Sequence, residues 1–194
     1  MRRLCVFCGS SGGSRDVYAD SARRLGRLLA ERGVGLVYGG GHIGLMGVLA
    51  DAALAAGGEV AGVIPQTLVD KELAHSGLTA LHVVATMHQR KALMADLADG
   101  FAALPGGFGT ADELFEILTW LQLGIHERPV GLLNVEGYFD ALLAWIDHTV
   151  AEGFLREQHR RALLVGEEPE ALLDAVLACP APPAVEKWIG DDER

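Results

Sequence analysis

The sequence predicts an α/β fold, with a single doubly wound parallel sheet that carries helices on both of its faces. Short apolar stretches of strand character alternate with helical patterns along the chain, and this alternation favours parallel pairing. Several stretches, such as Phe101–Leu104, are continuously apolar, which is typical of strands that are buried on both faces. The length of 194 residues suits one domain.

Each predicted strand is a short apolar run, and proline closes two of them. Pro65 ends the third run and Pro105 ends the fifth. The expected strands are Leu4–Cys8, Val34–Tyr38, Glu59–Ile64, Leu81–Val84, Phe101–Leu104, Val130–Leu133 and Leu163–Val165.

The segments between the strands carry helical patterns with start and stop signals. Ser14 is the expected cap of the first helix and Gly33 its stop, while Thr86-x-x-Gln89 has the form of a capping box. Residues 66–80 are expected to be irregular. The expected helices are 14–32, Leu45–Ala56, one that opens at Thr86, Thr110–Gly124, Tyr138–Gly153 and Pro169–Cys179.

Two segments follow from this pattern. Residues 1–179 are expected to form one α/β domain. Residues 180–194 are rich in proline and then in charge, which predicts a loose acidic C-terminal tail.

Composition excludes several classes of function. The net charge is −10, and the absence of a basic run argues against a nucleic-acid partner. No apolar run is long enough to cross a bilayer and the N-terminus lacks a signal peptide, so a cytoplasmic location is expected. The seven histidines show no paired ligand spacing, so no metal is expected, and no cofactor either.

The cysteines do not suggest redox chemistry. Cys5 and Cys8 have CxxC spacing, but they fall within a predicted strand. An offset of three residues places their side chains on opposite faces of a strand, so both are interpreted as core residues.

Glycines gather in three loops that each follow a predicted strand. The loops are Gly9–Gly13, Gly39–Gly41 with Gly44 and Gly47, and Gly106–Gly109. Because parallel strands end at one edge of a sheet, the three loops should line a common crevice. Two of them lead into helices, whose free N–H groups suit a phosphate. A single such loop is explained by a tight turn, but three favour a ligand site.

The second loop also matches a dinucleotide-binding pattern. Gly39–Gly44 reads G-x-G-x-x-G, but it follows the second strand rather than the first, and Glu59 begins the next strand where an acid should end it. The Walker pattern is absent. A dinucleotide-dependent oxidoreductase therefore stays an alternative, as does a non-catalytic nucleotide-binding or sensing module.

Three blocks of the sequence, two of which contain glycine loops, resemble one known family. Pro105-Gly-Gly-Phe-Gly-Thr-Ala-Asp-Glu113, Met87-His-Gln-Arg-Lys91 and Tyr38-Gly-Gly-Gly-His-Ile-Gly-Leu-Met-Gly47 are similar to motifs of the LOG family, the cytokinin riboside 5'-monophosphate phosphoribohydrolases. The likeness runs from about Leu4 to Leu155. His42 stands where many members have serine, and Ala111-Asp112 where many have Leu-Glu; these differences bear on the substrate preference and leave the core motif intact.

The resemblance implies a homodimeric, Rossmann-like hydrolase. Its substrate would be a nucleoside 5'-monophosphate, namely an N6-modified adenosine monophosphate or AMP. Hydrolysis of the N-glycosidic bond would release the free base, a cytokinin or adenine, and ribose 5-phosphate. The family label of lysine decarboxylase does not suit the chain. Pyridoxal phosphate needs a Schiff-base lysine, and only Lys71, Lys91 and Lys187 occur.

Glu113 and Arg90 are the candidate catalytic residues. A carboxylate near the anomeric carbon would stabilise an oxocarbenium-like state, and Glu113 follows the third glycine loop. Thr110-x-x-Glu113 is also a capping box, so Glu113 has a structural interpretation as well. Arg90 falls within an apolar helical arc, where a charge needs a partner. That partner would be Glu113, a phosphate or a core carboxylate.

The remaining candidates are substrate-binding residues. The glycine loops supply several, and Lys91 adjoins Arg90 in the sequence. Glu72 and Thr119 are implied by the resemblance alone. The candidates are Gly39, Gly40, Gly41, Glu72, Lys91, Gly106, Gly107, Phe108, Gly109, Thr110, Ala111, Asp112 and Thr119.

Overall fold

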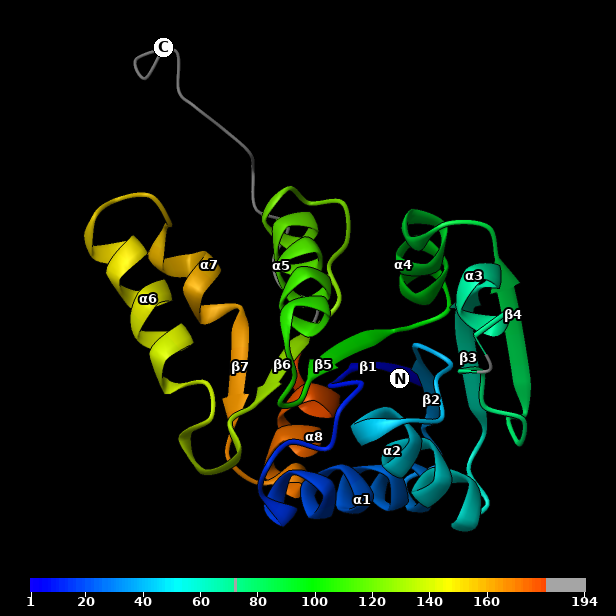
Figure 1. Cartoon of the computed structure of the whole chain (residues 1–194). Coiled ribbons are helices and arrows are strands. Elements are labelled where there is room, and N and C mark those ends of the chain that lie inside the picture. Colours follow the sequence, from blue (N-terminus) through cyan, green and yellow to red (C-terminus); the bar gives the residue numbers. More distant parts are fainter. Residues whose placement is uncertain (72, 181–194) are drawn as a thin grey trace.

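A computed structural model describes residues 1–71 and 73–180, and it contains one parallel sheet (Figure 1). The seven strands have the order β4-β3-β2-β1-β5-β6-β7, and every neighbouring pair is parallel. The predicted doubly wound sheet is therefore confirmed. The strands are β1 Arg3–Phe7, β2 Gly35–Tyr38, β3 Val60–Pro65, β4 Ala80–Val84, β5 Gly100–Ala103, β6 Val130–Leu133 and β7 Leu163–Gly166.

Helices cover both faces of the sheet. In Figure 1 helices α1, α2 and α8 lie below the sheet, and α4, α5 and α6 lie above it. The helices are α1 Asp16–Glu31, α2 Gly44–Ala55, α3 Gln66–Val69, α4 Met87–Asp96, α5 Phe108–Gln122, α6 Asp140–Ala151, α7 Glu157–Arg161 and α8 Pro169–Ala178, with a 3-10 turn at Val135–Gly137.

The sheet divides the core into two layers, and the residues of its central strand β1 alternate between them. Leu4 and Val6 pack with α1 and α2 in one layer, whereas Cys5 and Phe7 pack with α4 and α5 in the other. Cys8, just after the strand, belongs to the first layer. Both thiols are free and buried on opposite sides of the sheet, as the strand geometry predicted.

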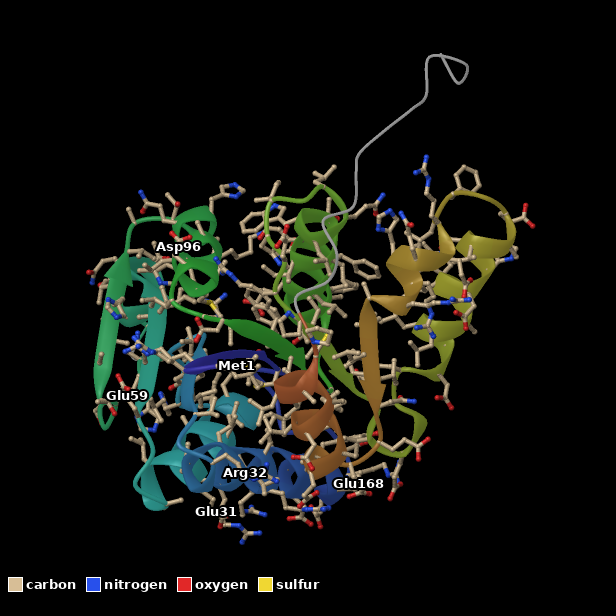
Figure 2. The ribbon with its side chains drawn as sticks, turned by 180° about the vertical axis from the view of Figure 1, so that it is seen from behind. Met1, Glu31, Arg32, Glu59, Asp96 and Glu168 are labelled. Atoms are coloured by element: carbon tan, nitrogen blue, oxygen red, sulfur yellow. The ribbon has the colours of Figure 1, made fainter. Side chains whose placement is uncertain are left out.

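The last helix is bound to the first. Arg24 of α1 forms ion pairs with Glu168 and Glu170 at the start of α8, with N···O distances of 2.8 and 2.6 Å. Arg32, at the end of α1, reaches Asp174 at 2.9 Å. Figure 2 shows Arg32 and Glu168 on the same side of the molecule. Through these exposed ion pairs, α1 and α8 connect the two halves of the sheet on the face opposite α5.

Several element boundaries differ from the sequence predictions. Ser14 does not cap α1, which begins at Asp16 with Arg15 as its N-cap and no side-chain cap bond. The Thr86 cap is confirmed, since its hydroxyl accepts a hydrogen bond from the Gln89 N–H at 3.1 Å. The stretch 66–80, expected to be irregular, contains α3, and α7 was not anticipated.

Two further predictions concern the C-terminus and the membrane. Apart from Pro180, the predicted tail falls on residues 181–194, which lie outside the described residues. None of the helices within residues 1–71 and 73–180 combines the length and the apolar character that spanning a bilayer requires.

Candidate active site

The three glycine loops meet where the winding of the sheet reverses, between β1 and β5. The Gly9 N–H donates a hydrogen bond to the Pro105 carbonyl at 3.0 Å, which joins the first loop to the third. The Leu45 N–H donates to the Gly9 carbonyl at 3.0 Å, which joins the second loop to the first. Glycine is required for this packing, because a Cβ at Gly44 would lie 2.3 Å from the Ser10 carbonyl carbon.

The loops enclose a crevice of about 340 Å³ at the carboxyl edge of the sheet. Ligands of open α/β sheets bind at such a reversal point. The lining residues are Cys8, Gly9, Ser10, Gly39, Gly41, Ile43, Met46, Ile64, Leu68, Leu73, Arg90, Gly107, Phe108, Gly109, Thr110 and Glu113.

The N-terminus of α5 opens into this crevice without a side-chain cap. Gly107 is the N-cap, and the Ala111 N–H is bonded to the Gly107 carbonyl at 3.1 Å. By helix geometry, the N–H groups of Phe108, Gly109 and Thr110 have no acceptor within the helix. By contrast, a first-turn N–H of α2 already donates to the carbonyl of the first loop. The helix dipole and the free N–H groups therefore favour an anion at α5.

Gly107 and Gly109 leave room for such an anion. A Cβ added at either residue would meet no atom of the described chain within 4 Å, and neither residue has a positive φ. Gly109 lies within the helix, where glycine costs about 1 kcal/mol relative to alanine. Since no internal contact requires glycine at these two positions, the space that they leave is available to a ligand.

The capping-box interpretation of Glu113 is wrong. Helix α5 begins at Phe108, two residues before the predicted start at Thr110. Thr110 is thus the third residue of the helix and Glu113 the sixth, beyond the first turn that a capping box occupies. The side chain of Glu113 points instead to Arg90.

Arg90 and Glu113 form a buried ion pair that lines the crevice. The Arg90 Nη1 donates to the Glu113 Oε1 at 2.6 Å, and each side chain is 8% exposed. The Arg90 Nε also donates to the Val63 carbonyl at 3.1 Å. Of the partners that the sequence left open, Glu113 is the one observed. Burial raises the pKa of the Glu113 carboxyl above its usual value, and Arg90 offsets part of this increase.

Lys91 does not line the crevice and is bound by carboxylates of α5. Its Nζ lies 3.0 Å from an Asp112 oxygen and 3.1 Å from a Glu116 oxygen. Burial lowers the pKa of Lys91, but the hydrogen bonds to the two carboxylates outweigh that effect and raise it. The ammonium is therefore kept charged by carboxylates of the chain itself.

The structure separates the predicted site residues into two groups. The crevice is lined by Gly39, Gly41, Arg90, Gly107, Phe108, Gly109, Thr110 and Glu113. Gly106 lines an adjoining cavity of about 280 Å³, where the Tyr138 hydroxyl donates to its carbonyl at 2.7 Å. Glu72 lies outside the described residues.

Five further predicted residues line neither the crevice nor the adjoining cavity: Gly40, Lys91, Ala111, Asp112 and Thr119. Thr119 lines a separate cavity of about 510 Å³ between α5 and α6, and its hydroxyl donates to the Phe115 carbonyl at 2.7 Å. The positions of Thr119 and Glu113 on one helix account for this. At about 100° per residue, six residues place the two side chains about 120° apart.

Sequence reasoning missed the apolar wall of the crevice. This wall consists of Ile43, Met46, Ile64, Leu68 and Leu73. Two of them lie in the stretch expected to be irregular, where no periodicity indicated a site. The other three follow a glycine loop or end a strand, which was an available signal.

Comparisons with known proteins agree with the motifs. A family model described as "possible lysine decarboxylase" matches residues 46–176. The cytokinin riboside 5'-monophosphate phosphoribohydrolase LOG of Oryza sativa is 52% identical over 163 residues, covering 84% of this chain and 67% of that protein. The enzyme LOG1 of Arabidopsis thaliana is 50% identical over 172 residues, or 89% of this chain and 81% of that protein. The chain belongs to the LOG family.

Solved structures of other proteins resemble the fold of this LOG-family chain. A molybdenum cofactor binding protein from Rippkaea orientalis superposes with a TM-score of 0.70 at 20% identity, covering 92% of this chain and 97% of that one. At that identity, the likeness concerns the arrangement of strands and helices alone. The match to the LOG family predicted from the three sequence blocks is thus confirmed.

Proposed function

We propose that this chain hydrolyses the N-glycosidic bond of adenosine 5'-monophosphates, either AMP itself or nucleotides that carry an N6 substituent, and releases the free base and ribose 5-phosphate. One observation carries the proposal: the buried Arg90–Glu113 pair lines the same crevice as the open N-terminus of α5. The names of the relatives at about half identity describe this reaction for those proteins.

The 5'-phosphate is proposed to bind at the start of α5. Three N–H groups, from Phe108, Gly109 and Thr110, lack acceptors within the helix, and the first turn contains no acidic side chain. Charge-assisted hydrogen bonds to phosphate are among the stronger polar contacts. A phosphate held there would bring the ribose toward Glu113, one turn further along the same helix.

Glu113 and Arg90 are the proposed catalytic residues. As the bond between C1' and the base nitrogen breaks, positive charge develops on the ribose and the Glu113 carboxylate stabilises it. A water molecule then forms the new bond to C1'. One of its protons leaves through Glu113, and the departing base takes up a proton at its nitrogen. Arg90 keeps the buried carboxylate ionised.

Decarboxylation through pyridoxal phosphate is not supported by the lysines. A Schiff-base lysine must lose its proton to attack an aldehyde. Lys91 is paired with Asp112 and Glu116, which raise its pKa and oppose that step. Lys71 is exposed, outside both the crevice and the adjoining cavity.

Incubation with defined nucleotides tests the proposal. Isopentenyladenosine monophosphate, AMP and isopentenyladenosine would be compared, with the free base and ribose 5-phosphate measured by chromatography. We expect turnover of the two nucleotides and a much poorer reaction of the nucleoside. Equal rates for nucleoside and nucleotide would remove the proposed phosphate site, and no release of base from any of them would refute the activity.

A homodimer is proposed to form through the face between α5 and α6. The cavity of about 510 Å³ on this face is lined by the exposed aromatic rings of Trp145 and Phe154, which are 54% and 86% exposed. Large apolar surfaces of this kind mark interfaces. A Phe154→Asp variant should sediment as a monomer where the unaltered chain sediments as a dimer, and a monomeric unaltered chain would contradict the proposal.

We also propose that the chain is located in the cytoplasm, because free thiols are typical of a reducing compartment.

A further inference from the structure

Gly39 lies directly against the guanidinium of Arg90. A Cβ built on Gly39 would lie 1.9 Å from the Arg90 Nη2 and 3.1 Å from its Cζ. The conformation of the backbone does not require glycine, since the φ angle of Gly39 is outside the positive range. The same Cβ would lie 3.1 Å from the Sδ of Met46, a flexible side chain, so the much closer contact with Arg90 is the main reason that this position needs a residue without a side chain.

The guanidinium is held in its observed position by contacts with three elements. Its Nε is bonded to the Val63 carbonyl of β3 and its Nη1 to Glu113 of α5, while Nη2 occupies the space beside Gly39. Only 7% of Arg90 is exposed, so the side chain is enclosed.

The loop that contains Gly39 is held beside Arg90 by two hydrogen bonds. The Tyr38 hydroxyl donates to the Gly41 carbonyl at 3.1 Å, and the His75 N–H donates to the Gly40 carbonyl at 2.9 Å. These two bonds anchor the backbone of Gly40 and Gly41, the residues that follow Gly39. A side chain at residue 39 would consequently displace the guanidinium rather than the loop.

We propose that Gly39 is a positioning residue of the active site, which seats the Arg90 guanidinium so that it holds Glu113. The sequence pattern had suggested that this glycine allows close approach of a ligand. The role proposed here is internal: the glycine makes room for a side chain of the protein. The inference rests on the proposed function only in that it names Glu113 as the catalytic carboxylate.

The ionisation of Glu113 should report a displaced guanidinium. Three charged groups act on this carboxyl: Arg90 and Lys91 from α4, and Asp112, which precedes Glu113 on α5. The buried thiols of Cys5 and Cys8 face it from the side of β1. Arg90 is the largest influence that lowers its pKa. Moving Arg90 away should therefore raise the pKa of Glu113 further.

Three variants separate the clash from other effects. Gly39→Ala introduces the clash, and Arg90→Lys keeps a positive charge but lacks Nη2. The double variant Gly39→Ala/Arg90→Lys carries the new methyl group without Nη2 in its way, and the close contact that remains is with the flexible Met46 side chain, whose Sδ is 3.1 Å away. Gly41→Ala is the matched control in the same loop, because its Cβ would meet the flexible end of Met46, at 2.9 Å, and not Arg90.

The measurement is a carbon-13 NMR titration of the Glu113 carboxyl, assigned with Glu113→Gln, together with kcat and KM for isopentenyladenosine monophosphate. We expect Gly39→Ala to raise the titration midpoint and to lower kcat on the order of 100-fold, the loss typical of a small misplacement. Gly41→Ala should leave the midpoint unchanged. The double variant should match Arg90→Lys in both midpoint and kcat.

Two results would overturn the proposal: an unchanged midpoint in Gly39→Ala, or a double variant that is clearly worse than Arg90→Lys. If Gly39→Ala does not fold, a folded double variant supports the proposal, and an unfolded double variant beside a folded Arg90→Lys refutes it. If the unaltered protein releases no base from any nucleotide, the proposed function fails, while the titration still decides the role of Gly39.

Discussion

Replacement of Glu113 by glutamine removes one negative charge from the crevice and leaves the Arg90 guanidinium with a neutral hydrogen-bond partner in place of an ionic one. Glutamine has the same shape, and its amide oxygen can still accept the hydrogen bond that Arg90 Nη1 donates at 2.6 Å. Since Glu113 is the sixth residue of α5 rather than part of a capping box, no helix cap is lost. Any large change in rate must then come from the charge.

The size of that change follows from the burial of the carboxylate. Two unit charges about 4 Å apart interact with about 4 kcal/mol at an effective dielectric constant near 20. A side chain that is 8% exposed is only weakly screened by solvent, so this dielectric constant is suitable. Because each factor of ten in rate corresponds to about 1.4 kcal/mol, kcat should fall by between about 100-fold and 1,000-fold.

The assay combines three measurements on Glu113→Gln. Released base gives kcat, calorimetric titration with AMP gives affinity, and thermal melting gives folding. Affinity for AMP should persist, because the proposed phosphate contacts do not involve residue 113. Glu170→Gln is the matched control, since it removes the same charge from an exposed pair with Arg24 on the far side of the sheet.

A folded Glu113→Gln protein that releases base at the unaltered rate would refute the catalytic assignment. Equal losses of rate in Glu170→Gln and Glu113→Gln would attribute the effect to net charge. Only a selective loss at residue 113, with AMP still bound, agrees with a carboxylate that acts on the ribose.

Three other outcomes are expected. Arg90→Ala should destabilise the fold by about 3–5 kcal/mol, measured by urea unfolding, because it leaves a buried carboxylate unpaired, whereas Lys91→Ala should do less, since its partners are partly exposed. Tyr138→Phe removes the bond to the Gly106 carbonyl and should weaken AMP binding by up to about tenfold, with kcat retained. Burial lowers the pKa of His126, so the unfolded chain binds the proton more tightly; the melting temperature should fall as the pH drops below about 6.5, and His126→Gln should flatten that slope.

The sequence predicted the fold because its signals are local and consistent. Continuously apolar strands and alternating helices left parallel pairing as the consistent solution, and the glycine loops had to share one edge. The buried position of Arg90 was also foreseeable, since an arginine in an apolar arc must find a partner. Both inferences depend on periodicity, which a single sequence contains in full.

The start of α5 was missed because two signals competed. Thr110-x-x-Glu113 resembles a capping box, but Gly107 can also begin a helix, and it is the observed N-cap of α5. The side chain of Thr110 lies beside Gly106 instead of capping the helix. The partners of Lys91 were missed for a different reason. They depend on how α4 faces α5, and that is set by tertiary packing across the sheet rather than by any local pattern.

The position of β1 has a consequence for synthesis of the chain. Among the strands of this sheet β1 comes first along the chain, and its partner β2 follows closely, but its other partner β5 follows much later, since Leu4 is in register with Gly100. Until then a central apolar strand presents an open edge, the kind of surface through which nascent chains aggregate. The loops at Gly9 and Gly106 come together only when that edge closes, so nucleotide cannot assist the early steps of folding and can only stabilise the completed sheet.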